Sequence, residues 1–238
     1  MQAHVHACTT RSATHDRNQD RAVVGDAVLA STADVEHREV GGPAIIAVLD
    51  GLGGHPAGDV ASEVAGQMLA SADVPGGEDG TSQLLQRADI MLQDAMRDRP
   101  ERFGMGTTVA MLALGANGHG TVANVGDSTV FRLADGGHLD QLTVTDRAAG
   151  STIRQCLGAT GDYVVEPHAF RIELSPGELY LLATDGLTDV VPLPDIEAAL
   201  RRDPAHAVEV LHAAVDEAGR PDDVTIVVVE TLDGDAQT

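Results

Sequence analysis

Aspartates stand at the ends of the strand-like segments of this sequence, and their type and spacing could do chemistry. Each lies where an apolar run rich in β-branched residues begins or ends. Aspartate is a poor strand former, and carboxylates held close together repel one another unless they are protonated or bridged by cations. Oxygen ligands without cysteine suit Mg²⁺ or Mn²⁺. In chain order, the candidate ligands are Asp20, Asp50, Asp127, Asp185 and Asp222.

The stretch around Asp50 carries the strongest signal. The run Ile45–Leu49 predicts a strand covered on both faces, and it stops at Asp50. The glycines of the following GLGG let the backbone approach a ligand without interference from a Cβ atom. A helix of small residues is expected from Pro56 to Ala70. Because Asp-Gly alone is equally typical of a turn, the functional interpretation depends on the repetition of the pattern at the other aspartates.

The elements that must position these aspartates alternate between groups of strands and pairs of helices. Strand-like runs from Gly106 onward, with a turn at Asn117-Gly118, predict hairpins and therefore antiparallel sheet. Asp73–Gly80 is expected to be a loop, with Thr81 or Ser82 capping the helix that follows. Two helices around 196–201 and 205–218 and a last strand at 224–231 complete the chain. This order fits two sheets packed face to face with helices outside.

Six short motifs follow one another along the chain: RNQD, DGLGG, GTT, GDS, TDGLTD and DDVT. Their order resembles the metal-dependent Ser/Thr protein phosphatases, the protein phosphatase 2C family in its bacterial-like form, from about Ser12 to Glu230. The resemblance implies an α+β fold, a four-layer α-β-β-α sandwich of two antiparallel sheets flanked by helices. A single phosphatase-like catalytic domain would span residues 1–238, with 1–11 and 232–238 as flexible ends.

The resemblance also implies a protein-serine/threonine phosphatase that hydrolyses phosphomonoesters with a metal-bridging hydroxide and two Mn²⁺ or Mg²⁺ ions per domain. Asp50 would bridge both ions, and Asp20 would hold a bound water. Asp127 matches a residue that holds a third, weaker ion in bacterial members. The implied metal ligands are Asp20, Asp50, the Gly51 carbonyl, Asp127, Asp185 and Asp222, of which Asp20, Asp50, Asp185 and Asp222 form the catalytic set.

Two positions depart from the family pattern. The family has a phosphate-binding arginine five residues before the first of these aspartates and an acid immediately before it, where this sequence has His15 and Gln19. Arg17 is close enough to replace the arginine, so His15 and Arg17 are both candidate phosphate-binding residues. The departures leave open a pseudophosphatase that acts as a regulatory binding module. A nucleotide-binding domain built on GLGGHPAG is disfavoured, because its glycine spacing is not a dinucleotide fingerprint.

The segment Asp146–Cys156 resembles a shortened form of the flap that borders the catalytic cleft in this family. Its basic residues are Arg147 and Arg154. On an acidic chain they are expected to attract an incoming phosphoryl group. The sequence supports equally well the interpretation that both are ordinary solvated loop arginines.

Composition narrows the choice of partners. The formal net charge of -22 over 238 residues disfavours nucleic acid and anionic membranes. All 15 basic residues are arginine, and the absence of lysine excludes a Walker-type phosphate loop and Schiff-base chemistry. Two distant cysteines, and no apolar run of about 20 residues, favour a cytoplasmic protein without disulfides or a membrane span. We expect a monomer that dephosphorylates a phosphorylated protein in signal transduction.

Overall fold

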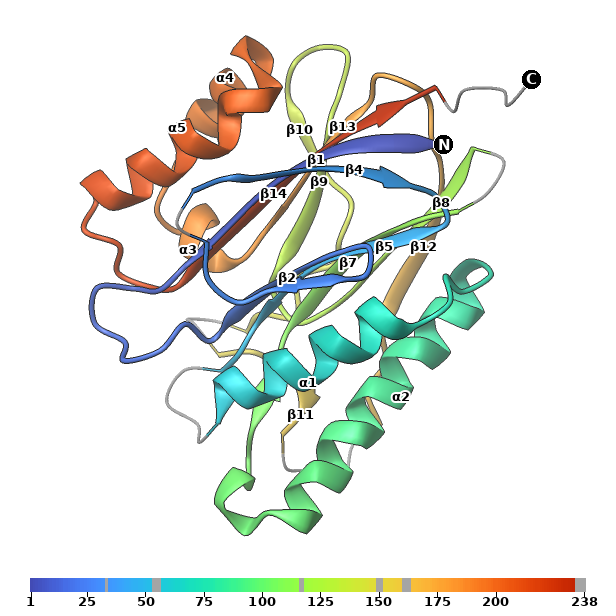
Figure 1. The fold of residues 1–238 in the computed structure, drawn as a ribbon, viewed down its shortest axis with the longest axis vertical. Coiled ribbons are helices and arrows are strands. Elements are labelled where there is room, and N and C mark those ends of the chain that lie inside the picture. Colours follow the sequence, from blue (N-terminus) through green and yellow to red (C-terminus); the bar gives the residue numbers. More distant parts are fainter. Residues whose placement is uncertain (33, 53–56, 116–117, 149–151, 160–163, 234–238) are drawn as a thin grey trace.

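Two antiparallel sheets packed face to face form the centre of the protein (Figure 1). The computed structural model describes residues 1–238 except 33, 53–56, 116–117, 149–151, 160–163 and 234–238. Within this part of the chain, the first sheet has the strand order β10 (Leu139–Gln141), β9 (Thr129–Leu133), β13 (Leu179–Ala183), β14 (Val224–Leu232), β1 (Gln2–Thr10) and β4 (Glu36–Gly41). The second has the order β12 (His168–Glu173), β8 (His119–Val125), β7 (Val109–Leu114), β5 (Ala44–Asp50), β2 (Asp20–Val24) and β3 (Ala27–Leu29). A short ribbon pairs β6 (Gly106–Thr107) with β11 (Leu157–Gly158).

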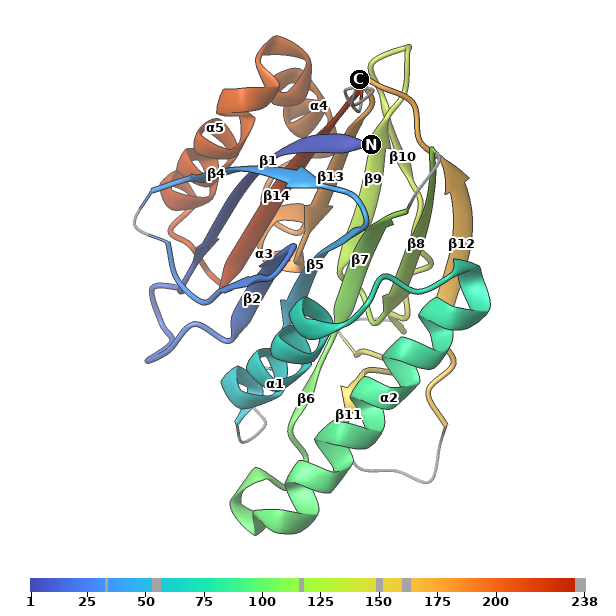
Figure 2. The ribbon, with the colours of Figure 1, turned by 45° about the vertical axis from the view of Figure 1, so that its right-hand side comes forward.

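Helices cover the outer face of each sheet, which gives four layers (Figures 1 and 2). Helices α1 (Gly58–Ser71) and α2 (Gly77–Asp98) pack on the second sheet, and a 3₁₀ turn at Pro100–Arg102 follows α2. The first sheet is covered by α3 (Asp185–Thr188), α4 (Leu193–Arg202) and α5 (Pro204–Glu217). The predicted α+β fold, a four-layer α-β-β-α sandwich, is confirmed.

Strand β5 shows why a central strand of this fold has an unbroken apolar sequence. Ile45, Ala47 and Leu49 pack in the apolar layer beneath α1 and α2. Ile46 and Val48 point the other way, into the layer between the two sheets. All five side chains are buried, so both faces of the strand have apolar neighbours. The first ionisable side chain of the strand comes at its last residue, where the chain leaves these layers.

Two boundaries differ from the sequence predictions. Residues 1–11, expected to be a flexible end, include β1, which pairs with β14 along its full length and with β4 on its other side. The expected loop Asp73–Gly80 is wrong in its second half, because α2 begins at Gly77. Two acidic residues lie in the first turn of α2, where negative charge interacts favourably with the helix dipole. The Thr81 hydroxyl donates to the Gly77 carbonyl at 2.8 Å instead of capping the helix.

Some predicted features fall on residues that the structure does not describe. The expected helix start at Pro56, the last two glycines of DGLGG and Asn117 of the expected turn lie outside the described residues. Helix α1 is described from Gly58. Among the helices that are described, none has the length and apolar character needed to cross a lipid bilayer.

Candidate metal centre

The strand ends that carry the candidate aspartates meet at one end of the sandwich. Asp20, the first residue of β2, pairs in register with Asp50, the last residue of β5. In the other sheet, Asp185 follows β13 and Asp222 precedes the neighbouring strand β14. Asp127 lies in the connection from β8 to β9. The structure therefore places carboxylates from both sheets at one end of the sandwich, but among the described residues no three ligand atoms of these five aspartates lie within 4.8 Å of one another.

Asp20 ties the two sheets to each other. Its Oδ2 atom accepts hydrogen bonds from the hydroxyls of Thr184 at 2.8 Å and Thr225 at 2.9 Å, which belong to the opposite sheet and its continuation. Asp20 is fully buried, and burial raises its pKa well above the usual range although the two threonine donors act in the opposite direction. The carboxylate is fixed in position, and its ionised form requires a nearby positive charge.

Asp50 lies in a strongly negative environment. Burial is the largest cause that raises its pKa well above the usual range, and the charges of Asp20, Asp185 and Asp222 follow. Burial, followed by repulsion from Asp127, raises the pKa of Asp185 to about 6. Burial also raises the pKa of Asp222. Carboxylates that hinder one another's ionisation in this way are stabilised by a bound cation.

The GTT and GDS motifs fix the backbone that presents Asp50. The Asp50 N–H donates to the Thr108 hydroxyl at 3.1 Å, and the Asp50 carbonyl accepts from the Thr107 hydroxyl at 2.9 Å and from the Thr108 N–H at 2.8 Å. The Thr108 hydroxyl also shares a hydrogen bond of 2.7 Å with that of Ser128. These contacts hold the end of β5 in one orientation.

The residues at this end of the sandwich fit a divalent cation. Two of the buried oxygen atoms there that have no hydrogen-bond partner among the described residues are Asp20 Oδ1 and Gln19 Oε1. An unsatisfied buried polar atom costs about 1–3 kcal/mol, which coordination by an ion would offset. The side chains offer oxygen ligands, as Mn²⁺ and Mg²⁺ require. At Gly51, a Cβ atom would lie 2.2 Å from the Gly58 carbonyl oxygen, so glycine is needed for α1 to start this close to Asp50.

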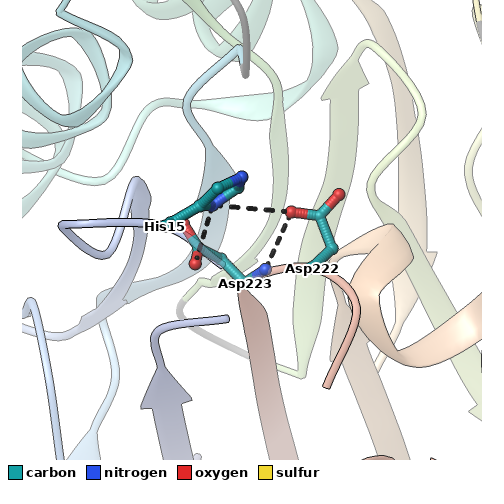
Figure 3. Close-up of side chains that lie close together, drawn as sticks. All are labelled: His15, Asp222 and Asp223. Atoms are coloured by element: carbon teal, nitrogen blue, oxygen red, sulfur yellow. Dashed lines mark hydrogen bonds and ion pairs between the residues drawn. The ribbon is translucent and has the colours of Figure 1, made fainter. Parts of the chain in front are cut away.

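His15, Asp222 and Asp223 form a second feature of this region (Figure 3). Within the described chain, these three residues form the group of potential metal ligands whose ligand atoms all lie within 4.8 Å of one another. His15 Nδ1 lies 3.1 Å from Asp223 Oδ1 and 3.9 Å from Asp222 Oδ1. The two Asp223 oxygens accept the backbone N–H groups of Ser12 at 2.6 Å and Gln19 at 2.7 Å. Asp223 therefore anchors the loop before β2. Of the two aspartates in this group, Asp222 is the one that remains available to bind a cation.

Comparison with known proteins places this geometry in a family. A family model described as Stage II sporulation protein E (SpoIIE) matches residues 41–232. The chain belongs to this PP2C-type phosphatase family. The matched region contains the strand ends of Asp50, Asp127, Asp185 and Asp222.

Named relatives and a solved structure agree with this assignment. The chain is 31% identical to the serine/threonine protein phosphatase PstP of Mycobacterium tuberculosis over 231 residues, which cover 85% of this chain and 43% of PstP. It is 27% identical to the serine/threonine phosphatase stp of Listeria monocytogenes over 217 residues, which cover 78% of this chain and 84% of stp. A crystal structure of the PstP catalytic domain with two manganese ions covers 98% of this chain and 100% of that chain, with a TM-score of 0.79 and 25% identity. This chain thus spans less than half the length of PstP.

The loop before β2 is where this PP2C-type chain departs from the family pattern. The His15 ring faces Asp223, whereas the Arg17 side chain is 78% exposed and pairs with Asp59 at 3.1 Å. The Gln19 carbonyl accepts the Gly51 N–H at 3.1 Å, which links the loop to the residue after Asp50. Of the two candidate phosphate-binding residues, Arg17 is the more accessible.

Sequence reasoning missed several contacts in the PP2C-type site. Thr184 directly precedes Asp185, and Thr225 lies two residues after Asp223, so the position of these threonines in TDGLTD and DDVT was the available signal. Asp189, the second aspartate of TDGLTD, was not recognised as a partner of Arg147. Arg147 itself is only 24% exposed and pairs with carboxylates, whereas Arg154 is exposed.

Proposed function

We propose that this PP2C-type chain is a metal-dependent protein serine/threonine phosphatase that hydrolyses phosphomonoesters. The observation that carries the proposal is the meeting of Asp20, Asp50, Asp185 and Asp222 at one end of the sandwich, with the pKa of each raised by burial. The names of the relatives, and the two manganese ions in the PstP structure, support it. The cofactor is Mn²⁺ or Mg²⁺, two per domain, which supplies a Lewis acid for the phosphoryl oxygens and an activated water.

The chain's own residues bind the ions and orient the reactants. Asp50, the Gly51 carbonyl, Asp185 and Asp222 would hold the ions. Asp20, whose Oδ2 is fixed by two threonines, offers its unpaired Oδ1 as an acceptor that orients a water molecule.

The substrate phosphate first meets the loop before β2. We assign that contact to Arg17, because its side chain is exposed and, among the described residues, its guanidinium pairs through one nitrogen with Asp59. A planar guanidinium suits two phosphate oxygens at once. His15 positions the loop through Asp223 instead of contacting the substrate.

The proposed substrate is a phosphorylated protein, and the proposed setting is signal transduction in the cytoplasm. The resemblance to the catalytic domain of PstP supports one catalytic domain in residues 1–238. The net charge of -22 is unfavourable for binding nucleic acid or anionic membranes and keeps copies of the chain apart, which supports a monomer.

Metal-dependent hydrolysis tests the proposal. The chain is assayed on a phosphothreonine peptide with Mn²⁺, with Mg²⁺ and with excess EDTA. We expect turnover with the metals, none in EDTA and none for Asp50→Asn. Asp195→Asn changes an exposed aspartate on α4 and serves as the matched control, with wild-type rates expected. Binding of Mn²⁺ and phosphopeptide without any hydrolysis would instead identify a regulatory binding module.

A further inference from the structure

Arg147 lies among three carboxylates at the edge of the metal centre. Its Nε is 2.8 Å from Asp127 Oδ2, its Nη2 is 2.7 Å from Asp185 Oδ2, and its Nη1 is 2.9 Å from Asp189 Oδ2. Every nitrogen of the guanidinium is therefore engaged. The side chains of Asp127 and Asp185 are 3% and 23% exposed and that of Arg147 is 24% exposed, so these two pairs are shielded from water more than ordinary surface ion pairs.

The residue before Arg147 holds it in this place. The Asp146 N–H donates to the Gly126 carbonyl, and the Gly126 N–H donates to Asp146 Oδ2, both at 2.9 Å. Asp146 Oδ1 also lies 3.0 Å from His168 Nε2. Arg147 itself forms an isolated bridge with Ile153. These contacts fix the backbone on both sides of Arg147 and join it to Gly126, the residue that precedes Asp127.

We propose that Arg147 is a built-in cation of the metal centre, which neutralises the Asp127 side of the carboxylate cluster and keeps a further divalent ion from binding there. The inference rests on the proposed function, because it concerns the same metal centre. A guanidinium that already binds Asp127 and Asp185 occupies the space between them and supplies the positive charge that an added ion would bring. Asp127 keeps one buried oxygen, Oδ1, without a partner in the described chain, so removal of Arg147 leaves both of its oxygens available.

Metal stoichiometry is the decisive measurement. Mn²⁺ is titrated into the protein. Bound ions are counted by equilibrium dialysis and by the loss of the electron paramagnetic resonance signal of free Mn²⁺. We expect Arg147→Gln to bind one ion more per chain than wild type, and Arg147→Lys, which keeps the charge, to bind the same number as wild type. Arg154→Gln is the matched control from the same segment and should also equal wild type.

Asp127 provides a second test that does not depend on an Arg147 variant. In the wild-type background, Asp127→Asn should leave the number of bound ions unchanged, because Arg147 and not an ion is the partner of Asp127. In the Arg147→Gln background, the same substitution should remove the added ion. Thermal melting in EDTA checks that each variant is folded.

The outcomes separate the inference from the proposed function. Equal numbers of ions in wild type and Arg147→Gln, or loss of an ion in Asp127→Asn alone, would overturn the role of Arg147. A wild-type chain that binds no Mn²⁺ at all would overturn the proposed function itself. Activity is not needed to read either result.

Discussion

Two neighbouring groups of carboxylates at the same end of the sandwich differ in their counter-charge. Asp127 and Asp189 share the Arg147 guanidinium, which also reaches Asp185. In the part of the chain that the structure describes, no arginine nitrogen pairs with the carboxylate of Asp20 or Asp50 within 4.0 Å. Both groups are acidic and close together, so acidity alone does not distinguish them.

The difference shows which part of the cluster depends on ions from solution. A buried carboxylate without a positive partner destabilises the folded chain, whereas one that is paired and hydrogen-bonded does not leave an uncompensated charge. Asp20 and Asp50 therefore need a bound cation for their ionised forms to be stable. Asp127 obtains its positive partner from the chain itself, and Asp185 lies at the boundary of the two groups.

The largest expected effect comes from removing Asp185, the aspartate that lies at the boundary of the two groups. Asp185→Ala takes a ligand from the ions, and we expect kcat/KM on a phosphopeptide to fall about a thousandfold, since metal-based stabilisation of the transition state is worth several kcal/mol. Asp189→Ala removes a side chain that contacts Arg147 only from outside, and a loss of about tenfold or less is expected. Steady-state kinetics with saturating Mn²⁺ measures both. Equal losses would show that the division into two groups is wrong.

The next effect concerns stability without metal. In the folded chain the pKa of Asp185 is raised to about 6, above its unfolded value, so the folded state binds more protons than the unfolded state between these values. The stability due to protonated Asp185 is present below the unfolded pKa and is lost as pH rises through the folded pKa. In EDTA, wild type should therefore lose on the order of 2–3 kcal/mol relative to Asp185→Asn between about pH 4 and pH 7.

Urea unfolding of both proteins across this pH range measures the effect. Added Mn²⁺ should remove most of the pH-dependent difference, because an ion that binds the ionised carboxylates stabilises the folded state. Parallel stability curves for wild type and Asp185→Asn in EDTA would contradict the assignment of a raised pKa to Asp185. A melting temperature that Mn²⁺ leaves unchanged would contradict a shared cation site.

The two groups were not equally predictable from sequence. Asp50 could be found because it ends an apolar strand and because glycines follow it in the sequence, and both signals are local. The partners of Arg147 lie 20, 38 and 42 residues away, and the threonines that bind Asp20 lie 164 and 205 residues away. Such contacts arise only when two sheets are stacked, and no local pattern encodes which side chains then face each other. The sandwich itself was predictable, because motif order and strand periodicity point to one fold.

The prediction of where α2 starts was wrong for a different physical reason. The sequence PGGEDG contains three glycines and a proline, which locally favour a loop. The helix forms there nevertheless, because Leu84, Leu85 and Leu92 further along α2 are buried against the second sheet and the acidic first turn favours the helix N-terminus. Tertiary packing extends this helix beyond its local propensity.

A smaller effect tests how Asp20 is held. Thr184→Val removes a hydroxyl that donates to the buried Asp20 carboxyl group at 2.8 Å and accepts the Thr225 N–H at 3.0 Å. We expect a loss of about 1–3 kcal/mol in the free energy of unfolding, because buried polar groups are left without a partner. Thr129→Val is the matched control. Its hydroxyl is also buried but has no partner among the described residues, so the substitution should be neutral or slightly stabilising. Denaturant unfolding compares them, and equal losses would mean that the contact with Asp20 contributes nothing specific.

The smallest expected effect concerns Arg17, which stands three residues before Asp20 and pairs with Asp59 instead of with the cluster. Its side chain is 78% exposed, so its attraction for a substrate phosphate is weakened by water and salt. We expect Arg17→Ala to raise KM for a phosphopeptide about two- to fivefold at low salt with little change in kcat, and the effect to fade at high salt. His15→Gln is the comparison, and it should leave KM nearly unchanged, because His15 Nδ1 faces Asp223. A rise in KM for His15→Gln and none for Arg17→Ala would transfer the phosphate contact to His15. It would also mean that substrate binds deeper in the cluster, beside Asp222. His15 would then be the positively charged partner that the chain itself supplies to the carboxylates without an arginine.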